Sequence, residues 1–308
     1  MFYYRPLSTP KDLPPSTEPF YPNIYLRSQL CTKPQWPPSS TSVEDKVAIV
    51  TGSNTGLGLE SSRQLLSYNL SHLIMAVRSI AKGEAAAAEL RREYPLATIE
   101  VWQLDMTSYE SIQKFVQRTE TLPRLDIVIL NAALGNLTFN IVKSTGHEEA
   151  MQVNYLSTVF LSILLLPVLK RKSPTGPGRL TIVSSGLALT VGIPTKTSSP
   201  LMTTFDNPKT YKWDTQYSMS KLLGHMFLYK LVDFVSADDV IVNLVDPGFT
   251  KGTELQRQAS GLLSVVFSLA KLATARTVRD GACTYLDATV VKGKESHGCF
   301  LMEWKIQP

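Results

Sequence analysis

The amino-acid sequence predicts an α/β fold, a single doubly wound parallel sheet with helices on both faces. Short apolar runs alternate along the chain with longer segments of helical pattern, which is the order of successive βαβ units. The runs are nearly continuous in Val, Ile and Leu, as expected of strands that are buried on both faces. Connections between parallel strands are right-handed, so the helices between them cover both faces. This is a Rossmann-type architecture.

The expected elements begin near residue 46. Apolar runs predict strands at 46–52, 72–78, 98–105, 126–132, 179–185 and 240–248. Helical patterns predict helices at 57–68, 80–94, 108–120, 147–171 and 215–234. The helix at 80–94 is the clearest, because it consists almost entirely of strong helix formers. The uncharged run 151–169 contains Gln152, Asn154 and Pro167, which favours a buried core helix over a membrane span.

Composition limits the classes of protein that are possible. The chain has 308 residues, of which 44% are hydrophobic and 19% charged, enough for one large domain or two small ones. The net charge of +5 is dispersed, without the basic stripe that nucleic-acid binding requires. We therefore expect a small-molecule partner and no nucleic acid.

The cysteines and the first residues bear on metal binding and location. Cys31, Cys283 and Cys299 are too few and too scattered for a zinc site or a disulfide framework. The histidines show no ligand spacing, so we expect no metal. Free thiols suit a reducing compartment, and the first residues lack the apolar core of a signal peptide. We expect a cytoplasmic protein without a membrane span.

A glycine-rich turn follows the first expected strand, with the sequence TGSNTGLG from Thr51 to Gly58. Glycine permits a tight turn and lets the backbone approach a pyrophosphate, which the N–H groups of the next helix then bind. An ordinary turn is the alternative, but the position between the strand and helix of a first βαβ unit favours dinucleotide binding. The expected nucleotide contacts are Gly52, Ser53, Asn54, Thr55, Gly56, Leu57 and Gly58.

The end of the second expected strand indicates which dinucleotide binds. An acidic residue about 20 positions beyond the turn holds a ribose 2′-hydroxyl, whereas an arginine accommodates a 2′-phosphate. Arg78 occupies that position without an acid nearby, and Lys82 follows one helical turn later. We therefore expect NADP(H), with a solvated charge at a strand end as the alternative role of Arg78.

A tyrosine and a lysine stand four residues apart in the helical segment 215–234. At this spacing Tyr217 and Lys221 lie on one face of the helix. A neighbouring ammonium favours the phenolate and lowers the pKa of a tyrosine from its usual value of about 10. Such pairs are common on helix surfaces, so the catalytic interpretation depends on the other motifs.

Together the motifs resemble those of the short-chain dehydrogenase/reductase family, over residues 45 to about 303. The T-G-x-x-x-G-x-G turn begins at Thr51, and Tyr217 with Lys221 is the Y-x-x-x-K pair. Segments 100–112, 122–133 and 178–185 are most similar to reductases of fungal secondary metabolism and to retinol dehydrogenase-like enzymes. The other matching positions are Asp105, Asn131, Ala132, Asn154, Ser185, Pro247 and Gly248.

The resemblance implies roles for these residues. Tyr217 is the proton donor in carbonyl reduction, or the base in alcohol oxidation, and Lys221 lowers its pKa and holds the nicotinamide ribose. Ser185 hydrogen-bonds the reacting oxygen. Asn154 holds a water that links Lys221 to solvent. Asp105 contacts the adenine. Further cofactor contacts are expected at Met106, Asn131, Ala132, Pro247, Gly248 and Thr250.

The chain departs from the family pattern near the expected active site. Ala133 replaces a glycine, and Gly252 stands where Thr or Ser is expected, so either Thr250 or Thr253 contacts the nicotinamide. An inserted loop at 186–216, with Leu201, Met202, Phe205, Tyr211 and Trp213, is expected to form a pocket wall. An insertion there can cover the usual dimer helix, which leaves monomer or homodimer open.

Two further segments lie outside these motifs. The segment 252–273 contains an amphipathic stretch at 262–273 and is either a lid over the substrate or core packing. Residues 1–44 hold nine of the 19 prolines and none of the 17 glycines, with several aromatic side chains. We predict an arm ordered at least over 20–36, lying against a catalytic domain at 45–308 and carrying none of the chemistry above.

The expected function is an NADPH-dependent oxidoreductase. It transfers hydride between nicotinamide and a hydrophobic ketone or aldehyde, or a secondary alcohol, in secondary metabolism. One alternative is a non-redox isomerase, dehydratase or cyclase on the same scaffold, and another is a nucleotide-sensing binding protein. The intact set of Ser185, Tyr217 and Lys221 argues against a redox-inactive relative.

Overall fold

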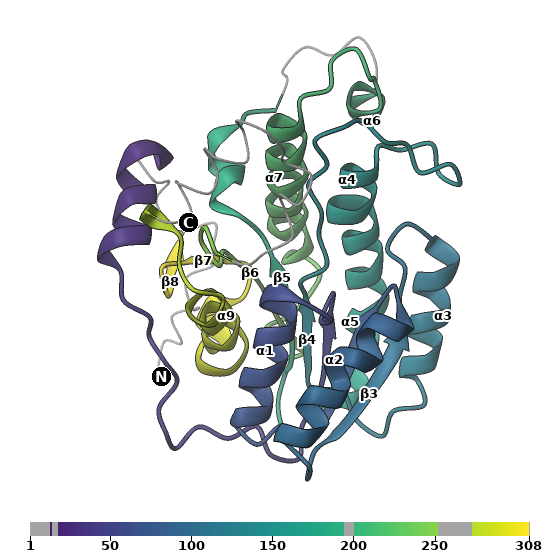
Figure 1. Cartoon of the computed structure of the whole chain (residues 1–308), viewed down its shortest axis with the longest axis vertical. Coiled ribbons are helices and arrows are strands. Elements are labelled where there is room, and N and C mark those ends of the chain that lie inside the picture. The colour runs from purple at the N-terminus through teal and green to yellow at the C-terminus, as the bar shows by residue number, and fades with distance from the viewer. Residues whose placement is uncertain (1–12, 14–17, 194–199, 252–272, 308) are drawn as a thin grey trace, which may run out of the picture.

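The sheet is the centre of the computed structural model, which describes residues 13, 18–193, 200–251 and 273–307. Among these residues eight strands form one sheet in the order β3-β2-β1-β4-β5-β6-β7-β8 (Figure 1). The strands are β1 (Val47–Thr51), β2 (His72–Val77), β3 (Thr98–Gln103), β4 (Ile127–Leu130), β5 (Gly178–Val183), β6 (Val240–Val245), β7 (Phe300–Met302) and β8 (Lys305–Gln307). All neighbours pair in parallel except β7 and β8. The expected doubly wound sheet is confirmed, with an antiparallel edge strand added.

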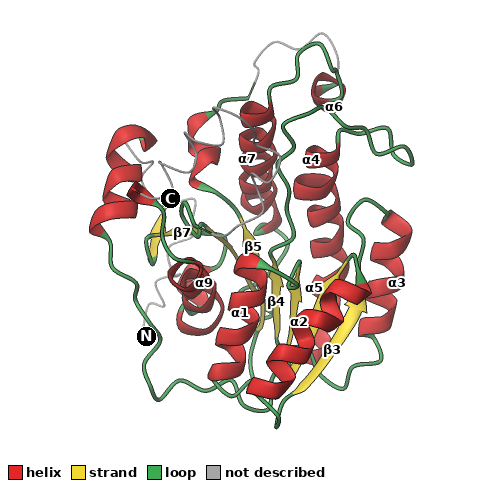
Figure 2. Ribbon diagram, viewed as in Figure 1, coloured by secondary structure: helices red, strands yellow, loops and turns green. Residues whose placement is uncertain are grey.

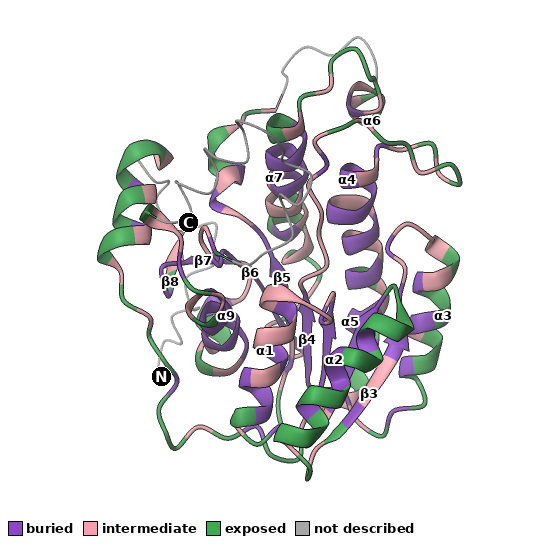
Figure 3. Ribbon diagram, viewed as in Figure 1, coloured by how far each residue is buried: buried purple, intermediate pink, exposed green. Residues whose placement is uncertain are grey.

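Helices cover both faces of the sheet (Figure 2). The helices within the described residues are α1 (Gly56–Ser67), α2 (Ile80–Glu93), α3 (Tyr109–Thr119), α4 (Glu149–Met151), α5 (Thr158–Lys172), α6 (Leu201–Phe205), α7 (Trp213–Leu231) and α9 (Val278–Leu286). One apolar cluster packs α1, α2 and α9 against the sheet, and a second packs α3, α5 and α7 against the other side. The buried surfaces of the helices face the sheet on each side, as burial in Figure 3 shows.

Strands β7 and β8 and helices α6 and α9 were not expected from the sequence. Strands β7 and β8 have three residues each, too short for a periodic pattern to show. Helix α9, with the sequence VRDGACTYL, contains Gly, Thr and Cys, which are weak helix formers. Its stability comes from burial, since Tyr285 and Leu286 are fully buried in the core beside α1.

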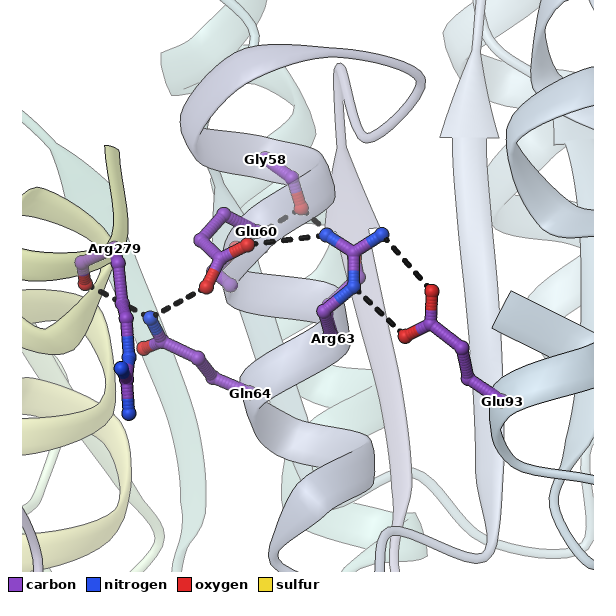
Figure 4. Close-up of polar contacts among 8 residues, drawn as sticks. Gly58, Glu60, Arg63, Gln64, Glu93 and Arg279 are labelled. Carbon is purple, nitrogen blue, oxygen red and sulfur yellow. Dashed lines mark hydrogen bonds and ion pairs between the residues drawn. The ribbon is translucent and has the colours of Figure 1, made fainter. Parts of the chain in front are cut away.

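The helix that follows the glycine turn is tied to its neighbours on both sides (Figure 4). On one side Arg63 of α1 donates to both carboxylate oxygens of Glu93 at the end of α2, at 2.9 and 3.3 Å. On the other side Gln64 donates to the carbonyl oxygen of Arg279 in α9 at 2.8 Å. Glu60 accepts from both Arg63 and Gln64, each at 3.1 Å. These bonds fix the helix whose N-terminus faces the turn.

One long helix runs through the core as α4, a π-helical segment η4 (Gln152–Ser157) and α5. Within the described residues it is the one helix that is long and apolar enough to cross a membrane. Of its most apolar stretch of 18 residues, 61% is buried in the fold. Its burial is that of a core helix. The π-helical segment includes Asn154, and such insertions in helices are frequent at functional sites.

The arm lies against the body of the protein. Two short helical segments, η2 (Phe20–Ile24) and η3 (Arg27–Cys31), lie near β7 and β8, and Ile24 joins the core cluster of α3, α5 and α7. Arg27 lies 3.5 Å from the buried carboxylate of Glu303. Further along, the Cys283 thiol donates to the Gln35 carbonyl and the Arg279 guanidinium lies over the Trp36 ring.

Candidate active site

A cavity of about 1060 Å³ opens at the carboxyl ends of the parallel strands. Residues that directly follow β1, β2, β4, β5 and β6 line it. They are Gly52, Arg78, Asn131, Ser184 and Asp246. From β1 the strand order runs to one side of the sheet through β2 and β3, and from β4 it runs to the other side. Ligands of open α/β sheets bind where the strand order changes in this way. The fold therefore directs the predicted site residues to one cavity.

The glycine turn forms one end of this cavity. Gly52 and Gly56 have φ values of 65° and 56°, in a backbone region that residues other than glycine rarely adopt. A Cβ on Gly58 would lie 2.4 Å from the Gly52 carbonyl oxygen and 2.5 Å from the Asn131 amide nitrogen. This glycine therefore allows α1 to pack against the turn. Gly52, Asn54, Thr55, Gly56 and Leu57 line the cavity, whereas Ser53 and Gly58 lie behind its surface.

Two exposed cations border the same end. Arg78 follows β2 and Lys82 lies in the first turn of α2, and both line the cavity. No ion pair among the described residues involves either side chain. Asp105 and Met106 line the cavity after β3, and the Asp105 carboxylate accepts from the amide and hydroxyl of Thr107 at 2.9 and 2.8 Å.

The end of β4 is joined to the end of β1. The Asn131 amide donates to the Thr51 carbonyl oxygen at 2.9 Å, and the Ala132 N–H donates to the Thr51 hydroxyl at 2.9 Å. Tyr285 of α9, fully buried, donates to the Asn131 side-chain oxygen at 3.0 Å. The expected cofactor contacts Asn131 and Ala132 line the cavity, and so does Tyr285, which the sequence analysis missed.

Ser185, Tyr217 and Lys221 line the cavity together. Ser185 lies two residues after β5, and Tyr217 and Lys221 lie on α7, with the Lys221 ammonium 5.7 Å from the centre of the Tyr217 ring. Burial raises the pKa of the Tyr217 phenol, while a hydrogen bond from Ser185 acts in the opposite direction. The net pKa shift of Tyr217 is therefore upward, opposite to the direction expected from Lys221, because burial is the larger effect.

Lys221 is itself buried, and its ammonium donates to the Val183 carbonyl oxygen at 2.8 Å. Burial lowers the pKa of Lys221 to about 8, and the negative charge of Asp246 opposes that shift. The amine therefore loses its proton at a lower pH than a solvent-exposed lysine does, and the ammonium form still predominates at neutral pH.

Asn154 lies behind the main cavity and does not line it. Its amide group forms two hydrogen bonds with the backbone of Leu134, at 2.9 and 2.8 Å, and donates to the Ser220 hydroxyl at 3.1 Å. Asn154 and Lys221 both line a second cavity of about 10 Å³. That volume is near the lower limit for a single water molecule.

The segment after β6 completes the wall. Asp246, Pro247, Gly248 and Thr250 line the cavity, and Asp246 accepts from the Gly186 N–H at 3.1 Å. Burial raises the pKa of Asp246, and the Arg276 guanidinium opposes that shift. Thr253, the rival of Thr250 for the nicotinamide, and the expected lid at 252–273, apart from residue 273, lie outside the described residues.

The inserted loop contributes its two ends to the cavity. Gly186, Leu187 and Val191 line one side and Trp213 another, while 194–199 lie outside the described residues. Leu201, Met202 and Phe205 instead pack into an apolar cluster with Met151 and Met219. Of the five side chains that were expected in a pocket wall, Trp213 lines the cavity and those three support α7. Tyr211 does not line it, and its hydroxyl donates to the Asn136 carbonyl oxygen at 2.6 Å.

The cavity also includes side chains to which the sequence analysis assigned no role. Phe20, Tyr21, Tyr25, Ser28 and Gln29 of the arm line it. The aromatic content of the arm was the one available signal, and the partners that bring it to the site lie more than 200 residues away. His225 of α7 is hydrogen-bonded to Ser184 at 2.8 Å and packs on Phe300.

These features are those of an oxidoreductase site on a Rossmann-type fold. Comparison with known proteins gives the same class. The model of the short chain dehydrogenase family matches residues 46–197. Short chain dehydrogenase/reductase mfmJ of Annulohypoxylon moriforme is 60% identical over 300 residues, 97% of this chain and 87% of that protein. Short chain dehydrogenase virL of Hypocrea virens is 45% identical over 278 residues, 90% of this chain and 82% of that protein.

A solved structure shares the fold. A short chain dehydrogenase from Shigella flexneri, complexed with NADP, matches with a TM-score of 0.63 and 21% identity. The match covers 85% of this chain and 98% of that one. Taken with the two relatives, it gives one conclusion. The protein belongs to the short-chain dehydrogenase/reductase family, as its motifs predicted, and is an oxidoreductase of CH–OH and C=O groups.

Proposed function

We propose that the protein is an NADP(H)-dependent oxidoreductase that transfers hydride between nicotinamide and the carbonyl carbon of a hydrophobic ketone or aldehyde. The reverse reaction would oxidise a secondary alcohol. One observation carries the proposal: Ser185, Tyr217 and Lys221 line the same cavity as the glycine turn and Arg78. Arg78 would hold one part of a nucleotide bound in this cavity, and Tyr217 would supply the proton.

The residues present fit this cofactor. The positive φ values at Gly52 and Gly56 favour glycine, which has no side chain. The backbone at the N-terminus of α1 is therefore open to a pyrophosphate. Arg78 and Lys82 offer positive charge to a 2′-phosphate, and Asp105 would contact the adenine. The bound cofactor supplies or accepts the hydride, and the protein supplies orientation and the proton.

The proton comes from Tyr217. Burial keeps its phenol protonated, which is the form that donates to a carbonyl oxygen during reduction. Ser185 donates a second hydrogen bond to the same oxygen and stabilises the negative charge that develops there. Lys221 lies beside Tyr217 and lines the small cavity together with Asn154. A water in that cavity would pass the proton that Lys221 and Tyr217 need for the next turnover.

The cavity walls favour a neutral, largely apolar substrate, because Leu187, Val191 and Trp213 border the carbonyl end. We infer a role in secondary metabolism and a cytoplasmic location, which the free state of Cys31, Cys283 and Cys299 supports. We treat 45–308 as one catalytic domain and 1–44 as its arm.

The substitution Tyr217→Phe tests the proposal. It removes the donated proton and keeps the ring, so the rate of NADPH oxidation with a reducible hydrophobic ketone should fall by roughly 10²- to 10⁴-fold. NADPH affinity, measured by fluorescence, should change little. Tyr229→Phe, on the exposed side of the same helix, is the matched control and should keep the wild-type rate.

Full activity in Tyr217→Phe would contradict the proposed mechanism. Conversion of substrate by the wild-type protein without loss of NADPH absorbance would instead support a non-redox enzyme.

A further inference from the structure

The arm segment from Phe20 to Gln29 forms part of the cavity wall that the proposed function does not use. Phe20, Tyr21 and Tyr25 contribute three aromatic rings, here called the arm wall. Phe20 and Tyr25 are half-buried, and Tyr21 is 51% exposed. Aromatic side chains are common in the walls of ligand cavities, where each offers a large contact area and a preferred ring geometry.

Hydrogen bonds hold the arm on the segment after β6. The Gln29 amide donates to the carbonyl oxygen of Phe249 at 2.8 Å, and its side-chain oxygen accepts from the Phe249 N–H at 3.1 Å. The same amide donates to Thr274 at 3.0 Å. Gln29 therefore pairs with the backbone directly after Pro247 and Gly248, on the cavity wall.

A buried arginine reinforces this attachment. Arg276, 8% exposed, donates to the Pro247 carbonyl oxygen at 3.2 Å and to the Ser28 carbonyl oxygen at 2.6 Å. It also donates to the Ser28 hydroxyl at 3.0 Å. One guanidinium thus joins the arm to the turn beside the active site, and the position of the arm is fixed by buried charge-assisted bonds.

Phe20 packs directly beside the catalytic strand end. A Cβ on Gly186 would lie 2.4 Å from the Phe20 Cε2 atom and 2.7 Å from its Cζ atom. Gly186 follows Ser185, so the ring edge of Phe20 rests on the backbone next to the hydroxyl that faces the reacting oxygen. The ring occupies space that any side chain at 186 would fill.

The three rings form one cluster. The ring centres of Phe20 and Tyr21 are 4.7 Å apart at an interplanar angle of 84°, and those of Tyr21 and Tyr25 are 5.1 Å apart. The Tyr25 hydroxyl is 2.8 Å from the Thr274 hydroxyl, which fixes that ring. Among the described residues of the arm, none of those that line the cavity is charged. The cluster offers edges and faces of aromatic rings to a neutral molecule.

We propose that the arm wall is the substrate-specificity element of this enzyme, and that it selects carbonyl compounds with a flat aromatic ring next to the reacting group. The inference rests on the proposed function, since it places the carbonyl beside Ser185 and Tyr217. Aromatic rings prefer offset or edge-to-face contact with one another, a contact that a saturated ring of the same carbon skeleton does not make.

A binding measurement tests the proposal without turnover. Dissociation constants are measured calorimetrically for 2-acetylnaphthalene and for its saturated counterpart 2-acetyldecalin, on the full chain saturated with NADP⁺, which carries no hydride to transfer. The hydrophobic effect alone favours the saturated compound, because its apolar surface is larger. We expect the wild-type protein to bind the aromatic ketone about tenfold more tightly.

Three variants locate the preference. Phe20→Leu keeps apolar volume without a flat ring and should abolish the tenfold preference, while Phe20→Tyr should retain it. Leu30→Ala, at an exposed position of η3 in the same arm, is the matched control and should leave the preference unchanged. Gly186→Ala displaces the Phe20 ring without changing the sequence of the arm and should weaken the preference as Phe20→Leu does.

Two results would overturn the proposal: a wild-type protein that binds both ketones equally or binds neither, and a Phe20→Leu variant that keeps the aromatic preference. A purely structural role for Phe20 would reduce the affinity for both ketones together. Failure of the proposed function has a different signature, in which the aromatic preference is present but NADPH is not oxidised with any ketone.

Discussion

The nucleotide end of the cavity comes from short stretches of chain, whereas the carbonyl end is collected from segments far apart in the sequence. Gly52 to Leu57 form one continuous turn, and Arg78 and Lys82 stand at the start of the next helical unit. At the carbonyl end, Phe20 of the arm rests on Gly186, and Gln29 pairs with Phe249. Binding of the nucleotide thus depends on short local motifs. Selection of the substrate depends on contacts between segments that are far apart in the sequence.

The substitution with the largest expected effect is at Lys221, the residue assigned both to the nicotinamide ribose and to Tyr217. Lys221→Met removes the ammonium beside Tyr217 and should lower the rate of ketone reduction by about 100-fold or more. Lys230→Met, at an exposed position of the same helix, is the control. Equal rates in Lys221→Met and the wild type would exclude the assigned role.

The same residue gives a pH dependence. Since burial lowers the pKa of Lys221 to about 8, the reduction rate should fall as the pH rises through that value. Between about pH 8 and 10.5 the unfolded chain binds this proton and the folded chain does not, so the contribution of Lys221 to the free energy of unfolding should rise with pH there. Rate profiles and urea titrations of the wild type and Lys221→Met measure the two effects.

A smaller effect sharpens the nucleotide side of the comparison. Arg78→Glu should weaken NADPH binding by roughly 10- to 100-fold, because it replaces a charge-assisted hydrogen bond to the 2′-phosphate by repulsion. NADH, which lacks that phosphate, should bind as before or better. Fluorescence titrations measure both constants. Arg92→Glu, at the exposed far end of α2, should change neither, and equal losses for both nucleotides would contradict the assignment.

The smallest effect concerns the attachment of the arm. Gln29→Ala removes two hydrogen bonds to Phe249 and one to Thr274, and should lower the free energy of unfolding by about 1–3 kcal/mol. Gln35→Ala, an exposed glutamine of the same arm, should cost less than about 0.5 kcal/mol. Urea denaturation measures the difference. Equal stability of the two variants would show that the arm is held elsewhere.

Local signals explain what could be predicted. The turn from Thr51 to Gly58 and the spacing of Tyr217 and Lys221 each lie within a few residues, and the strand periodicity extends over whole elements. The arm contacts could not be predicted, because Ser28 meets Arg276 across 248 positions and no local pattern records that meeting. The direction of the Tyr217 pKa shift was missed for the same reason, since burial is a property of the whole fold.

The attachment of the arm also orders events during synthesis. Tyr25 leaves the ribosome 249 residues before its partner Thr274, an interval of roughly 12 to 50 s at ordinary elongation rates. Strands β1, β2 and β4 meet their sheet partners much earlier, whereas α1 packs mainly against α9 near the C-terminus. In a nascent chain these strands can therefore pair while the aromatic rings of the arm still lack the surface they cover, and the first segment made is among the last to dock.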